Sequence, residues 1–194
     1  MGDAGVTPPC PSGPGLSRAL LVSALALLTG LLLAAGVILF VTLGWAASVP
    51  QPTRVFVALP ERVIDGDSVK YAEGTCRLVG LDSPERRPAP GQRLAKEAFE
   101  ALRDELQRGP NTVILYGKDK YDRWLCVILD SAGYMVNLML VESGFAQTYL
   151  LERSPFAMGL ADAQRRAQAE KRGIWALTPY ESPERYRKRM RDKP

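Results

Sequence analysis

The sequence of 194 residues contains no histidine. This absence excludes a Ser-His-Asp triad, a Cys-His pair and a histidine general base. It also excludes zinc sites built on histidine, and three cysteines in the whole chain cannot form a four-cysteine site. An enzyme of this composition must therefore work with carboxylates, arginine, lysine, tyrosine or a metal ion bound through oxygen.

A strong excess of either charge is also missing. The 25 Lys and Arg residues outnumber the 21 Asp and Glu residues only slightly, which gives a formal net charge of +4. A small positive excess is compatible with an anionic partner but does not identify one. The length suits one domain with an additional segment.

Charged residues are absent from Ala19 to Thr53, and apolar residues dominate as far as Ala47. A stretch of about 20 apolar residues spans the hydrocarbon core of a bilayer. Residues 19–47 therefore predict one transmembrane helix that acts as a signal anchor. The alternative is a signal peptide cleaved near Ala46-Ala47-Ser48, although the apolar region of such a peptide is usually only about 7–15 residues long.

The two ends of the chain have compositions of their own. Residues 1–18 are rich in proline and glycine, which predicts a disordered N-terminal segment. Residues 178–194 form a basic C-terminal tail, which is either a solvated helix or a segment that binds nucleic acid or anionic lipid. The folded domain is expected over residues 54–177.

Periodicity in this domain predicts an α+β fold. Segments rich in branched and aromatic residues are expected to be strands, and they are residues 54–59, 62–71, 75–81, 112–116 and 124–129. The four-residue spacing of Leu94, Ala98, Leu102 and Leu106 predicts a helix over 92–108. Further helices are expected over 136–143 and from Ser154 to Gly173. Five short strands with helices outside are compatible with an OB-type barrel.

Three charged motifs are candidates for function, and each has a simpler structural interpretation. Asp65-Gly66-Asp67-Ser68 is either a β-bulge with solvated acids or a cation ligand on a barrel rim. Asp82-Ser83-Pro84-Glu85 is either an Asx-type turn or a source of oxygen ligands for a hard cation. Residues 118–123 form either a solvated loop or a phosphate clamp in which arginine contacts phosphoryl oxygens.

Together, the three motifs resemble the staphylococcal nuclease (thermonuclease) family. The resemblance rests on residues 63–69, on Arg77 followed by Asp82-Ser83-Pro84-Glu85, and on Asp119-Lys120-Tyr121-Asp122-Arg123. It continues through Val136-Asn137 and Gly144-Phe145-Ala146 to Gly173-Ile174-Trp175. The resemblance implies a five-stranded OB-type β-barrel with three helices, here preceded by the transmembrane helix.

The resemblance also implies a calcium-dependent phosphodiesterase that cleaves DNA and RNA. Asp67 and Asp82 would give carboxylate oxygens to Ca²⁺, and Ser83 would give its backbone carbonyl. Glu85 would orient or deprotonate the attacking water. A metal ion of this kind neutralises phosphate charge and lowers the pKa of bound water, so no histidine is required.

The remaining implied residues bind the substrate. Arg77 and Arg123 would hold the scissile phosphate and stabilise the charge that develops in the transition state. Lys120 and Tyr121 would contact the phosphate of the nucleotide. Asp122 stands where the family usually has glycine, and it either weakens phosphate binding or points into solvent.

Other residues have weaker assignments. Arg86 and Arg87 are either solvated or in contact with the nucleic-acid backbone. Tyr149 is a candidate for stacking on a base. Cys76 and Cys126 are expected to pack as small hydrophobes, with a disulfide as the alternative if the domain lies outside the cytoplasm.

The leading hypothesis is therefore a single-pass membrane nuclease, acting as a monomer without a protein partner. Its catalytic domain is expected outside the cytoplasm, where calcium is plentiful and cellular DNA is not exposed. One alternative is a catalytically silent nucleic-acid-binding module on the same barrel, tethered to a membrane. A membrane-associated structural protein without a nucleic-acid role is the third possibility.

Overall fold

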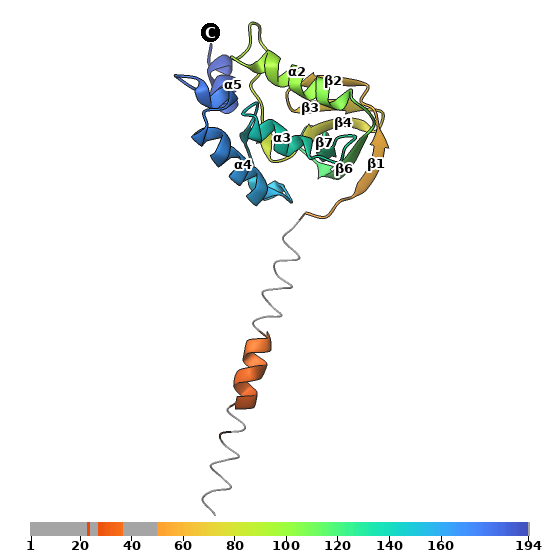
Figure 1. The fold of residues 1–194 in the computed structure, drawn as a ribbon, viewed down its shortest axis with the longest axis vertical. Coiled ribbons are helices and arrows are strands. Elements are labelled where there is room, and N and C mark those ends of the chain that lie inside the picture. The colour runs from red at the N-terminus through yellow and green to blue at the C-terminus, as the bar shows by residue number, and fades with distance from the viewer. Residues whose placement is uncertain (1–22, 24–26, 37–49, 194) are drawn as a thin grey trace, which may run out of the picture. The chain divides into compact units, whose positions relative to one another are not determined.

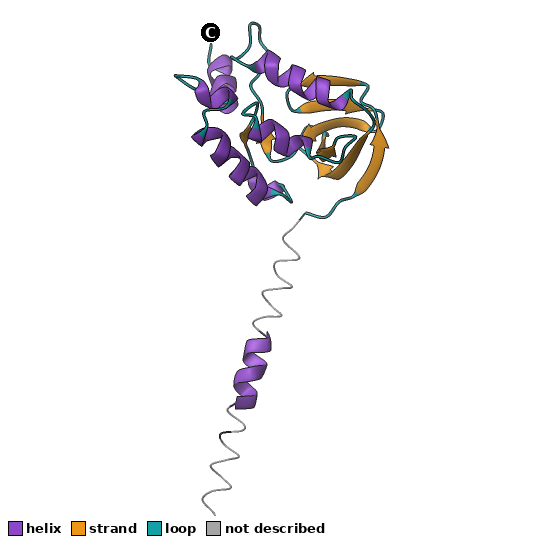
Figure 2. Ribbon diagram, in the orientation of Figure 1, coloured by secondary structure: helices purple, strands orange, loops and turns teal. Residues whose placement is uncertain are grey.

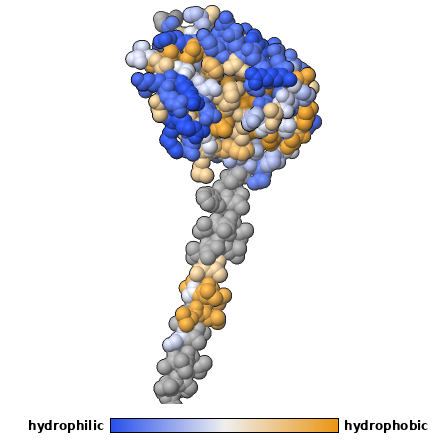
Figure 3. All heavy atoms as spheres, viewed as in Figure 1, coloured by the Kyte–Doolittle hydropathy of each residue, from blue (hydrophilic) through white to orange (hydrophobic). Residues whose placement is uncertain are grey.

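The computed structural model describes residue 23, residues 27–36 and residues 50–193 (Figure 1). The chain divides into two units, Met1–Ser48 and Val49–Pro194, which are described separately. In the first unit, residues 27–36 are helical, and Figure 3 shows apolar side chains covering this helix. No helix within the described ranges is both long and apolar enough to cross a membrane. The predicted segment 1–18 and most of the predicted anchor, residues 19–47, lie outside those ranges.

The second unit contains a six-stranded mixed sheet in the order β1-β6-β7-β4-β3-β2. Neighbouring strands are antiparallel except for β4 and β7, which are parallel. The strands are β1 (Arg54–Ala58), β2 (Arg62–Asp65), β3 (Ser68–Tyr71), β4 (Gly74–Leu78), β6 (Asn111–Lys118) and β7 (Trp124–Leu129). Two further short strands, β5 (Leu81–Asp82) and β8 (Gln147–Thr148), pair with each other.

The prediction of a closed five-stranded barrel is corrected by this topology. The edge strands β1 and β2 do not pair with each other, although only residues 59–61 separate them in the chain. Pro60 lies in this break, and proline cannot donate a ladder hydrogen bond. The sheet is curved (Figure 2), but it is not a closed barrel, because no hydrogen bonds join its two edge strands, β1 and β2.

The predicted strand over residues 62–71 is also corrected, because it is two strands joined by a tight turn. β2 and β3 pair antiparallel, and their register shifts between Val63 and Asp65. A Cβ atom on Gly66 would lie 2.8 Å from Ser83 Oγ and 3.0 Å from Ala98 Cβ. Glycine at this position therefore lets the turn pack directly against the loop that contains Ser83.

Four α-helices and two 3₁₀ helices accompany the strands of the second unit. They are α2 (Ala95–Leu106), α3 (Val136–Glu142), η1 (Leu151–Arg153), α4 (Ala157–Ala169), η2 (Gly173–Ala176) and α5 (Pro183–Arg191). The predicted apolar face of α2 is buried at Ala98, Leu102 and Leu106. The helix begins three residues later than predicted, because Leu94 adopts a left-handed conformation with φ of 64° and Gln92 is used in a loop.

The core lies between the curved sheet and helices α2, α3 and α4 (Figure 2). Asn137 on α3 is fully buried and connects this helix to the sheet. Its side-chain nitrogen donates to the carbonyl oxygens of Val79 and Cys126 at 3.1 Å, and its oxygen accepts from Ile128 N at 3.1 Å. The side-chain nitrogen and oxygen of this buried amide therefore both have hydrogen-bond partners.

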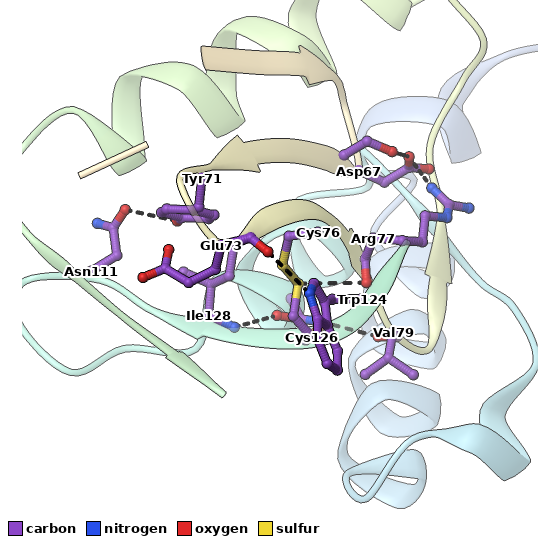
Figure 4. Close-up of a disulfide and its surroundings, with 12 residues drawn as sticks. Asp67, Tyr71, Glu73, Cys76, Arg77, Val79, Asn111, Trp124, Cys126 and Ile128 are labelled. Carbon is purple, nitrogen blue, oxygen red and sulfur yellow. Dashed lines mark hydrogen bonds and ion pairs between the residues drawn. A yellow bond between two sulfur atoms is a disulfide. The ribbon is translucent and has the colours of Figure 1, made fainter. Parts of the chain in front are cut away.

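Cys76 and Cys126 form a disulfide between β4 and β7 (Figure 4). The expectation that they pack only as small hydrophobes is therefore corrected in favour of the alternative. Both residues are buried, and their Cα atoms lie 5.9 Å apart, a spacing that suits a disulfide. Because Arg77 follows Cys76 directly, the bond fixes the strand that carries one of the predicted site residues.

Candidate active site

The three charged motifs converge on one cavity of about 810 Å³. Six residues that the sequence predicted for the site line it, namely Asp67, Arg77, Glu85, Lys120, Tyr121 and Arg123. The other two predicted residues, Asp82 and Ser83, are buried next to these, with exposed fractions of only 1% and 3%. Segments far apart in the sequence thus meet at one place, which is what the motif interpretation required.

Asp67 is positioned by the tight turn between β2 and β3. Its Oδ2 accepts a hydrogen bond from Ser83 N at 2.8 Å, and its Oδ1 accepts one from Ser68 Oγ at 3.1 Å. Only 4% of the residue is exposed, so the interpretation of this motif as solvated acids is wrong for Asp67. The turn therefore places a buried carboxylate beside the backbone of the second motif.

Arg77 on β4 bridges the two buried aspartates. Its Nη1 forms an ion pair with Asp67, which is visible in Figure 4, and its Nη2 donates to Asp82 Oδ1 at 2.7 Å. Nη2 also lies 3.3 Å from the carbonyl oxygen of Leu81. One guanidinium group therefore spans both carboxylates, which places the two aspartates within a few ångströms of each other.

Glu85 is fixed by Gln92, which lies outside the three charged motifs. The backbone nitrogen of Glu85 donates to Gln92 Oε1 at 2.8 Å, and Gln92 N donates back to the Glu85 carbonyl at 2.8 Å. The side-chain nitrogen of Gln92 donates to the carbonyl oxygen of Glu181 at 2.9 Å. Gln92 falls in the helix predicted over 92–108, and no local signal in the sequence distinguishes it from its neighbours.

The loop between β6 and β7 is organised by Asp119. Its Oδ1 accepts hydrogen bonds from Tyr121 N at 2.8 Å and Arg123 N at 3.0 Å, and its Oδ2 accepts one from Arg123 Nε at 2.9 Å. Burial favours protonation of Asp119, but these hydrogen bonds and the Arg123 charge outweigh it and lower the pKa of the carboxyl. Arg123 is therefore held in a fixed orientation at the cavity wall.

Asp122 adopts a left-handed conformation with φ of 61°, a region of backbone conformation that favours glycine. Aspartate tolerates this region better than most residues. Its side chain is 84% exposed and pairs with Lys118 at 2.7 Å, whereas Arg123 pairs with Asp119. Of the two interpretations of Asp122, the structure supports a carboxylate that points into solvent.

Lys120, Tyr121 and Tyr149 form another part of the cavity wall. The Tyr121 side chain is well exposed, with Lys120 Nζ 5.0 Å from its ring centre and Arg123 Cζ 5.4 Å from it. Arg86 has a different environment, because its guanidinium stacks over Phe99 at 3.8 Å and it is not part of the lining. A flat aromatic surface with two cations beside it is suited to a nucleotide.

Arg187 on α5 is the most prominent site residue that the sequence did not predict. Its Nη1 donates to Glu85 Oε1 at 2.6 Å and to Asp82 Oδ1 at 3.1 Å, and its Nη2 donates to Asp82 Oδ2 at 2.9 Å. Burial favours the neutral form of Arg187, but the hydrogen bonds to Asp82 and Glu85 and the charges of both carboxylates together outweigh it and raise the pKa of Arg187. One residue of the segment expected to form a separate basic tail thus lines the cavity.

Two other ionisable groups near the carboxylates have altered pKa values. Burial raises the pKa of Asp65, although the charges of Arg77 and Arg123 and the hydrogen bonds from Ser68 partly offset this effect. Burial and the nearby charge of Asp82 raise the pKa of Tyr180. Asp65, which lines the cavity, is therefore a carboxyl group in a partly desolvated environment.

The donor chemistry of the buried residues beside the cavity fits a hard cation. Asp67, Asp82 and the Ser83 carbonyl supply only oxygen, which is what Ca²⁺ prefers. Within residues 50–193 and the shorter described stretch, no group of three or more His, Cys, Asp or Glu residues is gathered in a metal-binding arrangement. In this structure the carboxylates are paired with Arg77 and Arg187 instead.

Comparisons with known proteins identify a family for this chain. A family model described as "Staphylococcal nuclease homologue" matches residues 75–177, which is more than half of the chain. Endonuclease YhcR of Bacillus subtilis (strain 168) is 28% identical over 148 residues, covering 65% of this chain and 12% of that protein. Succinoglycan biosynthesis protein ExoI of Rhizobium meliloti (strain 1021) is 32% identical over 125 residues, covering 60% of this chain and 63% of that protein.

A protein of Escherichia coli O157:H7 named "Uncharacterized endonuclease" is 28% identical over 119 residues, covering 59% of this chain and 74% of its own length. The chain spans less than two thirds of the length of the first two relatives. The family model covers Arg77, Asp82, Glu85 and Arg123 in one continuous match. The chain therefore belongs to the staphylococcal nuclease homologue family.

Proposed function

We propose that the protein is a Ca²⁺-dependent nuclease that hydrolyses phosphodiester bonds in DNA and RNA. The observation that carries the proposal is the convergence of Asp67, Arg77, Asp82, Glu85 and Arg123 around one cavity. Several relatives are named as endonucleases, which supports the same reaction class. The site supplies carboxylates and guanidinium groups, which is the chemistry that hydrolysis of an anionic ester without histidine requires.

Each residue has a distinct role in this proposal. Glu85 accepts a proton from the attacking water, whose oxygen then forms a bond to phosphorus. The bond between phosphorus and the leaving ester oxygen breaks, and the leaving oxygen takes up a proton from solvent. Arg77 and Arg123 stabilise the negative charge on the phosphoryl oxygens. Lys120 and Tyr121 bind the neighbouring part of the nucleotide.

The proposed metal site consists of Asp67, Asp82 and the carbonyl oxygen of Ser83. When bound there, Ca²⁺ would supply Lewis acidity and neutralise phosphate charge. The buried position of both aspartates keeps their charges close to the cation with little screening by water.

The test is digestion of single-stranded DNA and RNA by the full chain with Ca²⁺ or with an excess of chelator. Cleavage should require Ca²⁺, and Glu85→Gln should lower the rate by about 10²–10⁴-fold. Arg86→Ala is the matched control, because Arg86 lies one residue away but stacks on Phe99 outside the cavity. Full activity in chelator, or full activity of Glu85→Gln, would overturn the proposal.

A catalytically silent nucleic-acid-binding module is the second candidate. One observation favours it, namely that guanidinium groups pair with the buried carboxylate of Asp82 in this structure. A binding module would retain salt-dependent affinity for single-stranded DNA. It would leave the DNA intact at every Ca²⁺ concentration, so the same digestion separates the two candidates.

We further propose that residues 19–47 anchor the protein in a membrane and that the nuclease domain lies outside the cytoplasm. The apolar character of the segment supports the anchor. The Cys76–Cys126 disulfide supports the location, because disulfides persist in oxidising compartments. A protease added to intact cells should therefore digest the domain, and protection until lysis would contradict this orientation.

A further inference from the structure

We propose that Arg187 competes with Ca²⁺ for the carboxylate of Asp82 and thereby sets the Ca²⁺ affinity of the site. This inference rests on the proposed function, because it assumes that Asp82 is a cation ligand. It adds a residue of the C-terminal helix α5, outside the three charged motifs. Binding of the cation would require Arg187 to leave the carboxylates that it holds in this structure.

The contacts of Arg187 are those of an internal counter-ion. Its two terminal nitrogens bind both oxygens of Asp82, and one of them also binds Glu85. Asp82 is almost completely buried, whereas the Arg187 side chain remains 35% exposed. The guanidinium group thus covers Asp82 from the solvent side, where it can leave without disrupting the core.

Helix α5 is docked in a way that delivers Arg187 to this position. Ser182 caps the helix by accepting a hydrogen bond from Arg185 N at 3.3 Å. Tyr186 is only 3% exposed, and its hydroxyl donates to the carbonyl oxygen of Pro88 at 3.0 Å. Because Tyr186 precedes Arg187 directly, this anchor determines where the guanidinium group lies.

The charges around Asp82 explain why Arg187 and Ca²⁺ cannot both bind its carboxylate. Asp67, Asp82 and Glu85 face the guanidinium groups of Arg77 and Arg187. A divalent cation in place of Arg187 would balance the three carboxylates together with Arg77. A cation and Arg187 at the same carboxylate oxygens would instead repel each other at short range.

The experiment is calorimetric titration of the full chain with Ca²⁺, without nucleic acid and at constant ionic strength. Arg187→Gln keeps a polar side chain but removes the charge, so its Kd for Ca²⁺ should be lower than that of the wild type by about tenfold. Lys188→Ala is the matched control, because it removes one positive charge from the exposed side of the same helix. Its Kd should stay close to the wild-type value.

Thermal unfolding gives a second measurement that does not depend on catalysis. Without Ca²⁺, Arg187→Gln should unfold at a lower temperature, because Glu85 loses its ion pair and the buried Asp82 keeps only the one with Arg77. Saturating Ca²⁺ should raise its Tm by more than it raises the wild-type Tm. An unfolded Arg187→Gln variant would be replaced by Arg187→Lys, which keeps one point charge and should show an intermediate Kd.

The outcomes separate this inference from the proposed function. Tighter Ca²⁺ binding by Arg187→Gln supports the competition, provided that Asp82→Asn abolishes binding. Equal or weaker binding by Arg187→Gln overturns it while leaving the calcium-dependent nuclease intact. Absence of Ca²⁺ binding in the wild type and in every variant overturns both.

Discussion

Gln92 and Glu85 are joined by two hydrogen bonds that close the loop between them. The backbone nitrogen of Glu85 donates to Gln92 Oε1, and the backbone nitrogen of Gln92 donates to the Glu85 carbonyl, both at 2.8 Å. The same side chain also binds the carbonyl oxygen of Glu181, just before α5. Gln92 therefore controls the position of Glu85 and supports the segment that leads to Arg187.

This arrangement makes Gln92 a positioning residue for the proposed base. Gln92→Ala should lower kcat by about 10- to 100-fold, because small displacements of a catalytic group are costly. KM should change little, since Gln92 is not among the residues that line the cavity. Steady-state cleavage of single-stranded DNA measures both constants. Gln107→Ala, at the exposed end of α2, is the control and should behave as the wild type, whereas an equal loss of kcat there would argue against a specific role.

The positions of the predicted site residues could be inferred because they belong to short local motifs. Each motif contains its turn residues together with its functional side chains, as Gly66 and Asp67 illustrate. The family resemblance then supplied their mutual proximity, which no periodicity in the chain could give. The roles of these residues remain predictions, although their convergence on one cavity is a property of the structure.

Other features could not be predicted because they depend on tertiary contacts. The break after Asp65 arises because Gly66 packs against Ser83, far along the chain. The docking of α5 depends largely on one buried tyrosine, Tyr186, within a segment whose other residues are mostly charged. Such a segment resembles a solvated tail, so Arg187 could be assigned to the cavity only from the structure.

The close approach of Gly144 and Gly173 gives a prediction about stability. Both have positive φ, and a Cβ atom on Gly144 would lie 2.2 Å from the Arg172 carbonyl oxygen. Gly144→Ala should therefore destabilise the protein by about 2–3 kcal/mol, and urea unfolding measures the loss. Gly133→Ala is the control, because Gly133 has φ of 87° but open space around it. That variant should lose only the conformational cost of about 1–2 kcal/mol, and equal losses in both variants would show that the contact contributes nothing.

The lowered pKa of Asp119 predicts a difference in acid stability. A carboxyl group whose pKa is lower in the folded state stabilises the fold above its unfolded pKa and loses this effect as pH falls through the folded value. Asp119→Asn should therefore be less stable than the wild type at pH 7, and the difference should shrink below about pH 4. Urea unfolding at a series of pH values measures it. Asp122→Asn, which alters an exposed ion pair in the same loop, should cost little at any pH. If the difference in unfolding free energy between wild type and Asp119→Asn stayed constant down to pH 2.5, the lowered pKa of Asp119 would be contradicted.

The Cys76–Cys126 disulfide predicts that the fold depends on redox conditions. The bond closes a loop with a sequence separation of 50 residues. In the chain-entropy model, this closure stabilises the folded state by about 4 kcal/mol. Reduction with dithiothreitol should lower Tm by roughly 10 °C, as measured by circular dichroism. The double variant Cys76→Ala/Cys126→Ala should have the same low Tm with or without the reductant, because it has no bond to lose. If the wild-type Tm were insensitive to complete reduction, the disulfide would contribute nothing to stability, and the position of Arg77 would have to depend on the pairing of β4 with β3 and β7 and on the ion pairs of Arg77.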